Sequence, residues 1–113
     1  MIKVIAEDFI KEEYLDIVRP LYTELVAKTK EEKDCIEYNL YIDEDDKTHF
    51  VFIEEWPDHE ALQRHCRTEH FRRLVPMINK HQSKECVITI MEIFKWVNIL
   101  SVGYITVSYT HLR

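Results

Sequence analysis

Two β-prone segments joined by a charged turn constrain the fold of this chain more than any other feature. In residues 36–42 the large apolar side chains alternate with mostly polar ones, and residues 50–56 form a second apolar run. Alternation with a period of two is typical of a half-buried strand. The turn between the two runs, Asp43–Lys47, consists only of charged residues. The pattern therefore predicts an antiparallel β-hairpin.

The residues before the hairpin predict a strand followed by a helix. Ile2–Phe9 is short, rich in β-prone residues and bounded by charge, which favours a first strand. Apolar residues in Glu12–Lys30 recur at helical spacing and form one broad stripe. Pro20 lies inside this helix, where it removes a backbone donor, so we expect a bend there.

The residues after the hairpin predict two more helices and a last strand. Asp58 is suited to cap a short helix that ends near Cys66, and Thr68 to cap a second helix from residue 69 to about His81. Cys86–Phe94 alternates again and is expected to be a strand. The resulting order, β-α-β-β-α-β, predicts an α+β fold with a ferredoxin-like antiparallel sheet.

The last predicted strand is apolar on both faces, because Ile88 and Ile90 lie opposite Val87 and Met91. One face is expected to pack on the helices. The other face needs a different cover, and a second copy of the chain is the simplest one. The sequence therefore predicts a homodimer.

Length and charge limit the kinds of partner. A chain of 113 residues fits one domain, and its formal charge of −6 argues against nucleic acid or an anionic membrane as the main partner. Two acidic residues precede any long apolar run, so no secretory signal is expected. The three cysteines lack metal-ligand or CxxC spacing. We therefore expect a cytoplasmic protein with reduced thiols.

The C-terminal end differs from the rest in composition. Residues 97–113 carry one charged residue and the only glycine, Gly103. They could form an extra strand, an arm exchanged between subunits or sequence foreign to the domain. We therefore assign the domain to residues 1–96 and leave the tail, 97–113, out of the site.

The segment from Glu54 to Phe71 carries a family motif. It reads E-x-W, then A-L-x-x-H, then T-x-H-F, and resembles the signature of the antibiotic biosynthesis monooxygenase domain. Residues 1–6 and Cys35–Tyr41 are also similar to that family, so the resemblance covers roughly residues 1–95. Asp34 departs from the pattern, because many members have glycine before the cysteine.

The resemblance implies an enzyme of the quinol monooxygenase type in a dimeric α/β-barrel. Such relatives oxidise aromatic polyketides or quinols with molecular oxygen and use no metal or flavin, so no cofactor is expected. A base removes a proton from the substrate, whose anion then reduces oxygen. The resemblance places His65 or His70 as the base, in a slot formed by Tyr38, Phe50, Phe52, Glu54, Trp56 and Phe71.

The residues themselves support part of this assignment. Phe50, Phe52, Glu54 and Trp56 share one face of a strand because side chains alternate. Burial of Glu54 on that face would raise its pKa unless a donor or cation meets it. His70 lies in the first turn of a helix, whose dipole favours neutral imidazole, a usable proton acceptor.

The sequence bears on three other possible functions. His59, His65, His70 and His81 do not stack on one helical turn, so the spacing argues against a zinc site. Some relatives degrade haem with an Asn, a Trp and a His, but Asp8 and His65 stand in place of the first two, which argues against haem degradation. Others isomerise phosphorylated signalling sugars, for which the candidate phosphate ligands are Arg64, Arg67, Arg72 and Arg73.

A non-catalytic dimer that binds a small molecule or responds to stress would carry the same pocket. Consumption of oxygen distinguishes that alternative from the monooxygenase.

Overall fold

The computed structural model describes residues 1–95, so the predicted tail, 97–113, lies outside the described residues. The predicted elements are present, and their observed bounds differ from the predicted ones by a few residues at most. In chain order they are β1 (Ile2–Phe9), the short 3-10 helix η1 (Glu12–Tyr14), α1 (Leu15–Lys30), β2 (Glu37–Ile42), β3 (His49–Trp56), α2 (His59–Cys66), α3 (Glu69–Asn79) and β4 (Val87–Glu92).

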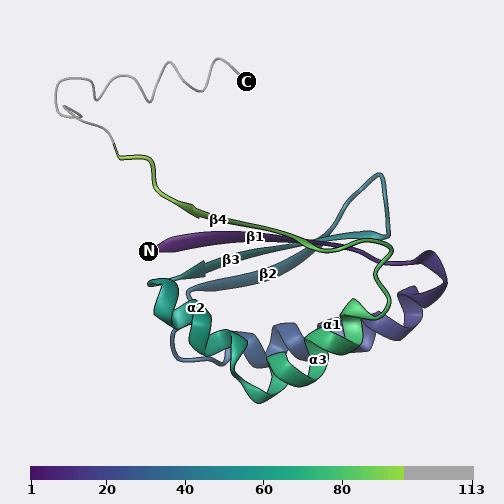
Figure 1. Ribbon diagram of the computed structural model, residues 1–113, viewed down its shortest axis with the longest axis horizontal. Coiled ribbons are helices and arrows are strands. Elements are labelled where there is room, and N and C mark those ends of the chain that lie inside the picture. Colours follow the sequence, from purple (N-terminus) through teal and green to yellow (C-terminus); the bar gives the residue numbers. More distant parts are fainter. Residues whose placement is uncertain (96–113) are drawn as a thin grey trace.

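The four strands form one antiparallel sheet in the order β2-β3-β1-β4. Figure 1 shows the three α-helices along one side of this sheet, with β4 at its edge. The arrangement confirms the predicted α+β, ferredoxin-like fold. Within residues 1–95, no helix covers the second face of the sheet (Figure 1).

Side-chain caps fix where the second and third helices begin. The Asp58 carboxylate accepts a hydrogen bond from the backbone N–H of Ala61 at 2.8 Å, and the Thr68 hydroxyl accepts one from that of Phe71 at 3.3 Å. Both bonds satisfy donors that a helix N-terminus leaves without an intrahelical acceptor. The two predicted caps are therefore confirmed.

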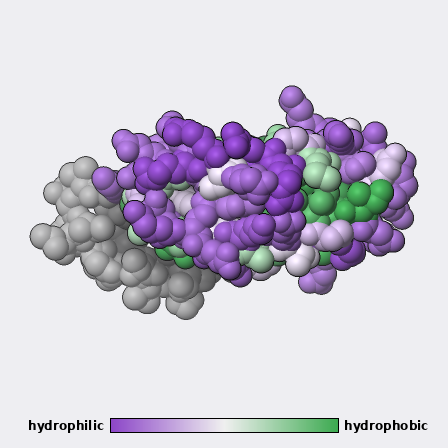
Figure 2. Space-filling view, turned by 90° about the horizontal axis from the view of Figure 1, so that it is seen from below, coloured by the Kyte–Doolittle hydropathy of each residue, from purple (hydrophilic) through white to green (hydrophobic). Residues whose placement is uncertain are grey.

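The main core lies between the sheet and the helices. Its largest fully buried side chains include Trp56 and Phe50 from β3, Leu25 from α1 and Leu74 from α3. The outward surface of the helix layer is mostly hydrophilic (Figure 2). This division follows from helices that are apolar on one side only.

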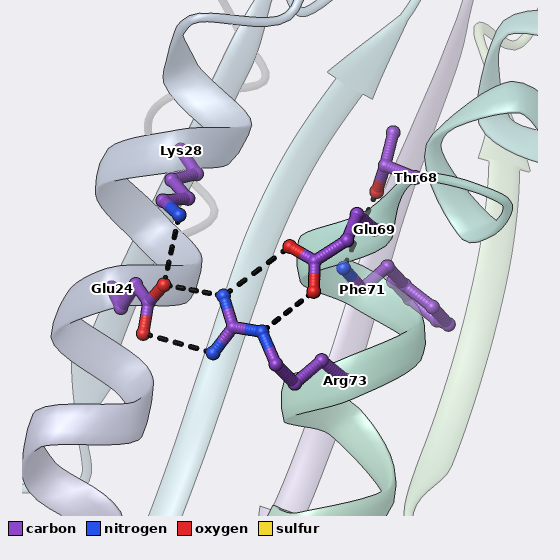
Figure 3. A network of polar contacts seen from close by, with 6 residues as sticks. All are labelled: Glu24, Lys28, Thr68, Glu69, Phe71 and Arg73. Atoms are coloured by element: carbon purple, nitrogen blue, oxygen red, sulfur yellow. Dashed lines mark hydrogen bonds and ion pairs between the residues drawn. The ribbon is translucent and has the colours of Figure 1, made fainter.

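A charged cluster joins α1 to α3 on that outward surface (Figure 3). The Arg73 guanidinium donates to Glu24 through both terminal nitrogens and to Glu69 through Nε at 2.7 Å. Lys28 lies 3.0 Å from the same Glu24 carboxylate. The cluster fixes the two helices side by side, and its bidentate pair is a geometry that arginine favours.

One expectation about the last strand was wrong. Ile88 and Ile90 pair with Ala6 and Val4, so they point to the helix side of the sheet, yet they remain 59% and 46% exposed. Ile2, Val4 and Asp8 of β1, on the same face, are buried, because helices cover them. A cavity separates β4 from α3, so helices do not close over this edge strand.

None of the helices within residues 1–95 is long and apolar enough to cross a bilayer.

Candidate active site

A partly open, mostly apolar cavity of about 270 Å³ lies between the sheet and the helices. Its wall combines residues from the four strands with residues from all three α-helices. Among its lining residues, those that can exchange a proton are Asp8, Tyr38, Glu54, His65, Cys66 and Cys86. Apolar concavity with a few polar groups is the usual form of a small-molecule site.

Glu54 brings a buried carboxyl group to the cavity. Its side chain comes from the middle of β3 on the face that meets the helices, and the residue is only 5% exposed. The indole N–H of Trp56 donates to its Oε1 at 2.9 Å. Burial raises the pKa of Glu54 to about 7, against the opposing effect of that hydrogen bond. The sequence analysis expected a raised pKa only if no donor met the carboxyl group; the Trp56 donor is present, and burial outweighs it.

His65 brings an imidazole to the same cavity from the end of α2. The residue is 2% exposed, and its ring packs against those of Trp56, Phe71 and Tyr38 at centroid distances of 4.7, 5.0 and 5.4 Å. Burial lowers the pKa of His65, although the nearby Glu32 carboxylate raises it. The imidazole is therefore held in its neutral form near neutral pH.

One carboxylate oxygen holds both candidate histidines. Oε2 of Glu32 lies 2.8 Å from Nδ1 of His65 and 2.6 Å from Nε2 of His70. Glu32 follows α1, whereas the histidines come from α2 and α3. These three side chains could also hold a metal ion, since their ligand atoms lie within 4.8 Å of one another. The spacing of the histidines in the sequence could not predict this group of three, because its carboxylate comes from a distant segment.

Asp8 forms a second polar end of the cavity. It lies four residues from Val4 on β1, and Val4 pairs with Glu54. The two carboxyl groups are thus separated by roughly 13 Å along the strand direction. Asp8 accepts hydrogen bonds from Tyr22 Oη at 2.6 Å and Gln82 Nε2 at 2.9 Å. Burial raises the pKa of Asp8, and these two donors lower it.

The predicted site residues divide into two groups. Tyr38, Phe52, Glu54, His65 and Phe71 line the cavity. Phe50 and Trp56 do not line it and are buried in the core. His70 does not line it either, and its ring contacts Glu32.

Glu32 was missed by sequence reasoning. It occurs in the charged run Glu31–Asp34, whose composition is that of an exposed loop. A single glutamate in such a run has no periodicity or spacing that would mark it.

A second concave region differs from this cavity. An open groove of about 580 Å³ runs between α1 and β2 and is lined by residues that include Arg19, Lys30 and Ile42. Among the described residues, its lining includes no aspartate, glutamate or histidine. We therefore place the candidate active site in the smaller cavity.

The arginines proposed as phosphate ligands lie elsewhere. No Lys or Arg of the described residues lines the candidate active-site cavity. Arg64 donates to Asp34 at 2.9 and 3.1 Å, and Arg73 is bound by Glu24 and Glu69. The Asp34 side chain, which stands where many members have glycine, therefore ties the loop after α1 to α2.

The chain matches the model of the antibiotic biosynthesis monooxygenase family over residues 1–77, and it belongs to this family. Among solved structures, it is 57% identical to a protein described as antibiotic biosynthesis monooxygenase, with a TM-score of 0.83 over 84% of this chain and 100% of the other. A conserved protein from Methanosarcina mazei Go1 is 30% identical, with a TM-score of 0.77 over 80% of this chain and 90% of that one.

A curated relative extends the comparison to a longer protein. An uncharacterized protein of Synechocystis is 31% identical over 65 residues, which are 58% of this chain. The chain spans about two fifths of that relative's length, 42%.

Proposed function

We propose that this protein is a cofactor-independent monooxygenase that oxidises a quinol or another electron-rich aromatic with molecular oxygen. The observation that carries this proposal is that Glu54 and His65 both line one mostly apolar cavity. Family membership and the likeness to a protein described as a monooxygenase support it.

The two proton-handling groups suit the chemistry. Neutral His65 can accept a proton from a phenol or from an activated CH2 group. Glu54, whose pKa is about 7, is roughly half protonated at neutral pH and can donate to an oxygen that gains negative charge. Tyr38, Phe52 and Phe71 supply the apolar aromatic wall that keeps water away from the anion.

The reaction balances without an external reductant. For an anthrone, the CH2 carbon and O2 give a carbonyl group and one water. The substrate supplies both hydrogens and all four electrons, one oxygen atom enters the product, and the other leaves as water. The proton first taken by His65 returns to the departing oxygen, which resets the base.

We further propose that the active form is a cytoplasmic homodimer that closes an α/β-barrel. The sheet face opposite the helices carries half-buried Ile5 and Ile53 as register neighbours, with exposed Val87 and Met91 beside them on β4. A second copy packed on this face would remove these apolar groups from water.

The alternative isomerase function has less support. A phosphorylated sugar needs a cation or a set of N–H donors in its pocket. The lining of the cavity contains two carboxyl groups and, among the described residues, no Lys or Arg. A phosphate placed there would meet negative charge without compensation.

Oxygen uptake by the purified, metal-free full chain tests the proposal. We expect uptake above autoxidation with a quinol or anthrone from a panel, unchanged by chelator or by added flavin. Absence of uptake across the panel, together with saturable binding of the same compounds, would contradict the proposal and favour a non-catalytic binding protein.

A further inference from the structure

His65 and His70 contact the same carboxylate oxygen of Glu32, but through different ring nitrogens. His65 faces Glu32 with Nδ1, and His70 faces it with Nε2. An ionised carboxylate only accepts hydrogen bonds, so each of these nitrogens carries a proton. A neutral imidazole has one N–H, which determines the state of the other nitrogen.

For His65 the remaining nitrogen is Nε2. Since burial keeps the ring neutral and Nδ1 donates to Glu32, Nε2 is unprotonated. No hydrogen-bond partner for this nitrogen occurs among residues 1–95, and the residue lines the cavity. His65 therefore presents a free proton acceptor to a bound molecule.

His70 is placed differently. It does not line the cavity, and it contacts the same Glu32 oxygen at 2.6 Å. Thr68 lies between the two histidines in sequence and donates to the backbone carbonyl of His65 at 2.7 Å. His70 thus fixes Glu32 while the helix corner fixes His65.

A metal ion is the competing explanation for these three side chains. Zinc–ligand bonds of about 2.0–2.2 Å in a tetrahedral site place neighbouring ligand atoms about 3.4 Å apart. The observed separations of 2.8 and 2.6 Å from Glu32 Oε2 are shorter and lie in the hydrogen-bond range. The geometry therefore favours a hydrogen-bonded triad.

We propose that Glu32 is the positioning residue of the site, that it holds His65 in the Nδ1–H tautomer with Nε2 as the base, and that His70 anchors Glu32. The inference rests on the proposed function for its catalytic part only. When Nε2 takes the proton of the substrate, the ring becomes an imidazolium, and the Glu32 carboxylate stabilises that charge. This is the way in which a carboxylate supports histidine in serine hydrolases.

The first test needs no substrate. Nitrogen-15 NMR of the full chain, at a pH where His65 is neutral, reports which ring nitrogen carries the proton. We expect the Nδ1–H form in the wild type and in His70→Ala. An Nε2–H form at His65 in the wild type would overturn the proposal, whatever the protein oxidises.

The groups that face His65 are Glu32 from the loop after α1, His70 from α3, and Tyr38 and Glu54 from the strands. Removal of the Glu32 charge alone leaves the other groups unchanged. In Glu32→Gln we expect the NMR-measured pKa of His65 to fall, because the carboxylate is the group that raises it. An unchanged pKa would contradict the proposed contact.

Kinetics on the substrate that gives oxygen uptake provide the second test. Glu32→Gln should lower kcat by roughly 10²-fold with little change in KM, and should move the acidic limb of the kcat profile to lower pH. The matched control is Asp43→Asn, which removes a carboxylate from His49 (2.9 Å) outside the cavity and should leave kcat unchanged. Equal losses in both variants would contradict a positioning role.

Titration of the metal-free chain with Zn²⁺ or Co²⁺ tests the competing explanation. We expect neither ion to raise activity. Tight binding that His70→Ala abolishes, together with activity that depends on the ion, would replace the positioning role by a metal site.

Discussion

Folding makes ionisation of the Glu54 carboxyl group unfavourable. Its cross-strand neighbours are Val4 and Tyr38. Among residues 1–95, the Trp56 indole is its one hydrogen-bond donor, and no cation lowers its pKa. Because the pKa is about 7 in the folded chain and near 4.5 in the unfolded chain, the unfolded state loses this proton first as pH rises.

The consequence is a pH-dependent cost to stability. Between pH of about 4.5 and about 7, ionisation of the unfolded chain lowers the stability of the wild type, and the full cost remains above that range. Glu54→Gln should therefore gain stability relative to the wild type as pH rises through this window, by roughly 3 kcal/mol. Denaturant unfolding of both proteins at several pH values measures the difference. Parallel pH curves would show that Glu54 ionises normally.

At the scale of single residues, the sequence predicted well where periodicity applies. Alternation along β3 placed Phe52 and Glu54 on the buried face correctly. It could not separate the residues that line the cavity from Trp56 and Phe50 in the core, because all four share that face. Glu32 was not predictable, since its partners lie 33 and 38 residues away and depend on the tertiary packing of three helices.

The corner between α2 and α3 is the element that holds the candidate site. Thr68 caps α3 and also donates to the last turn of α2, so one hydroxyl joins the two helices. His65 and His70 lie on either side of this corner. Its geometry therefore determines whether both rings reach Glu32.

Thr68→Ala should destabilise the fold by about 1 kcal/mol, the usual cost of a lost N-cap. It should also lower kcat, because the helix corner then holds His65 less firmly. Thr68→Ser keeps the hydroxyl and serves as the control. Urea unfolding and oxygen uptake measure the two effects. If the alanine variant matched the serine variant in both, the cap would have no role in the site.

The starts of α2 and α3 were predictable because Asp58 and Thr68 are residue types that favour the N-cap position. The burial of the β4 side chains was not predictable in this way. Its alternation predicted a strand correctly, but the sequence does not record that a cavity lies between β4 and α3. Which apolar face is covered depends on where the helices cross the sheet, and that is a property of the whole fold.

In the molecule as a whole, the sheet face that no helix of residues 1–95 covers is the surface on which we expect a second copy to pack. Ile5 and Ile53 are adjacent near its centre, with Lys3 and Glu55 forming a salt bridge of 3.3 Å at one end of the same face. Apolar groups surrounded by charged ones are characteristic of an interface between subunits.

Ile53→Lys should convert the expected dimer into a monomer, because it places a charge at the centre of that face. Gln63→Lys adds the same charge on exposed α2 and should leave the dimer intact. Analytical ultracentrifugation distinguishes the two states. A monomeric wild type, or a dimeric Ile53→Lys variant, would contradict the proposed interface.

The proposed function requires that the cavity activate an aromatic substrate toward oxygen with side chains alone. The most direct measurement is mass spectrometry of the product formed under oxygen-18 gas by the metal-free, flavin-free chain, with His65→Ala as the comparison. We predict one labelled oxygen atom per product, the other in water, and a rate lowered roughly 10²-fold or more in the variant. Unlabelled product, or an undiminished rate in His65→Ala, would contradict the account.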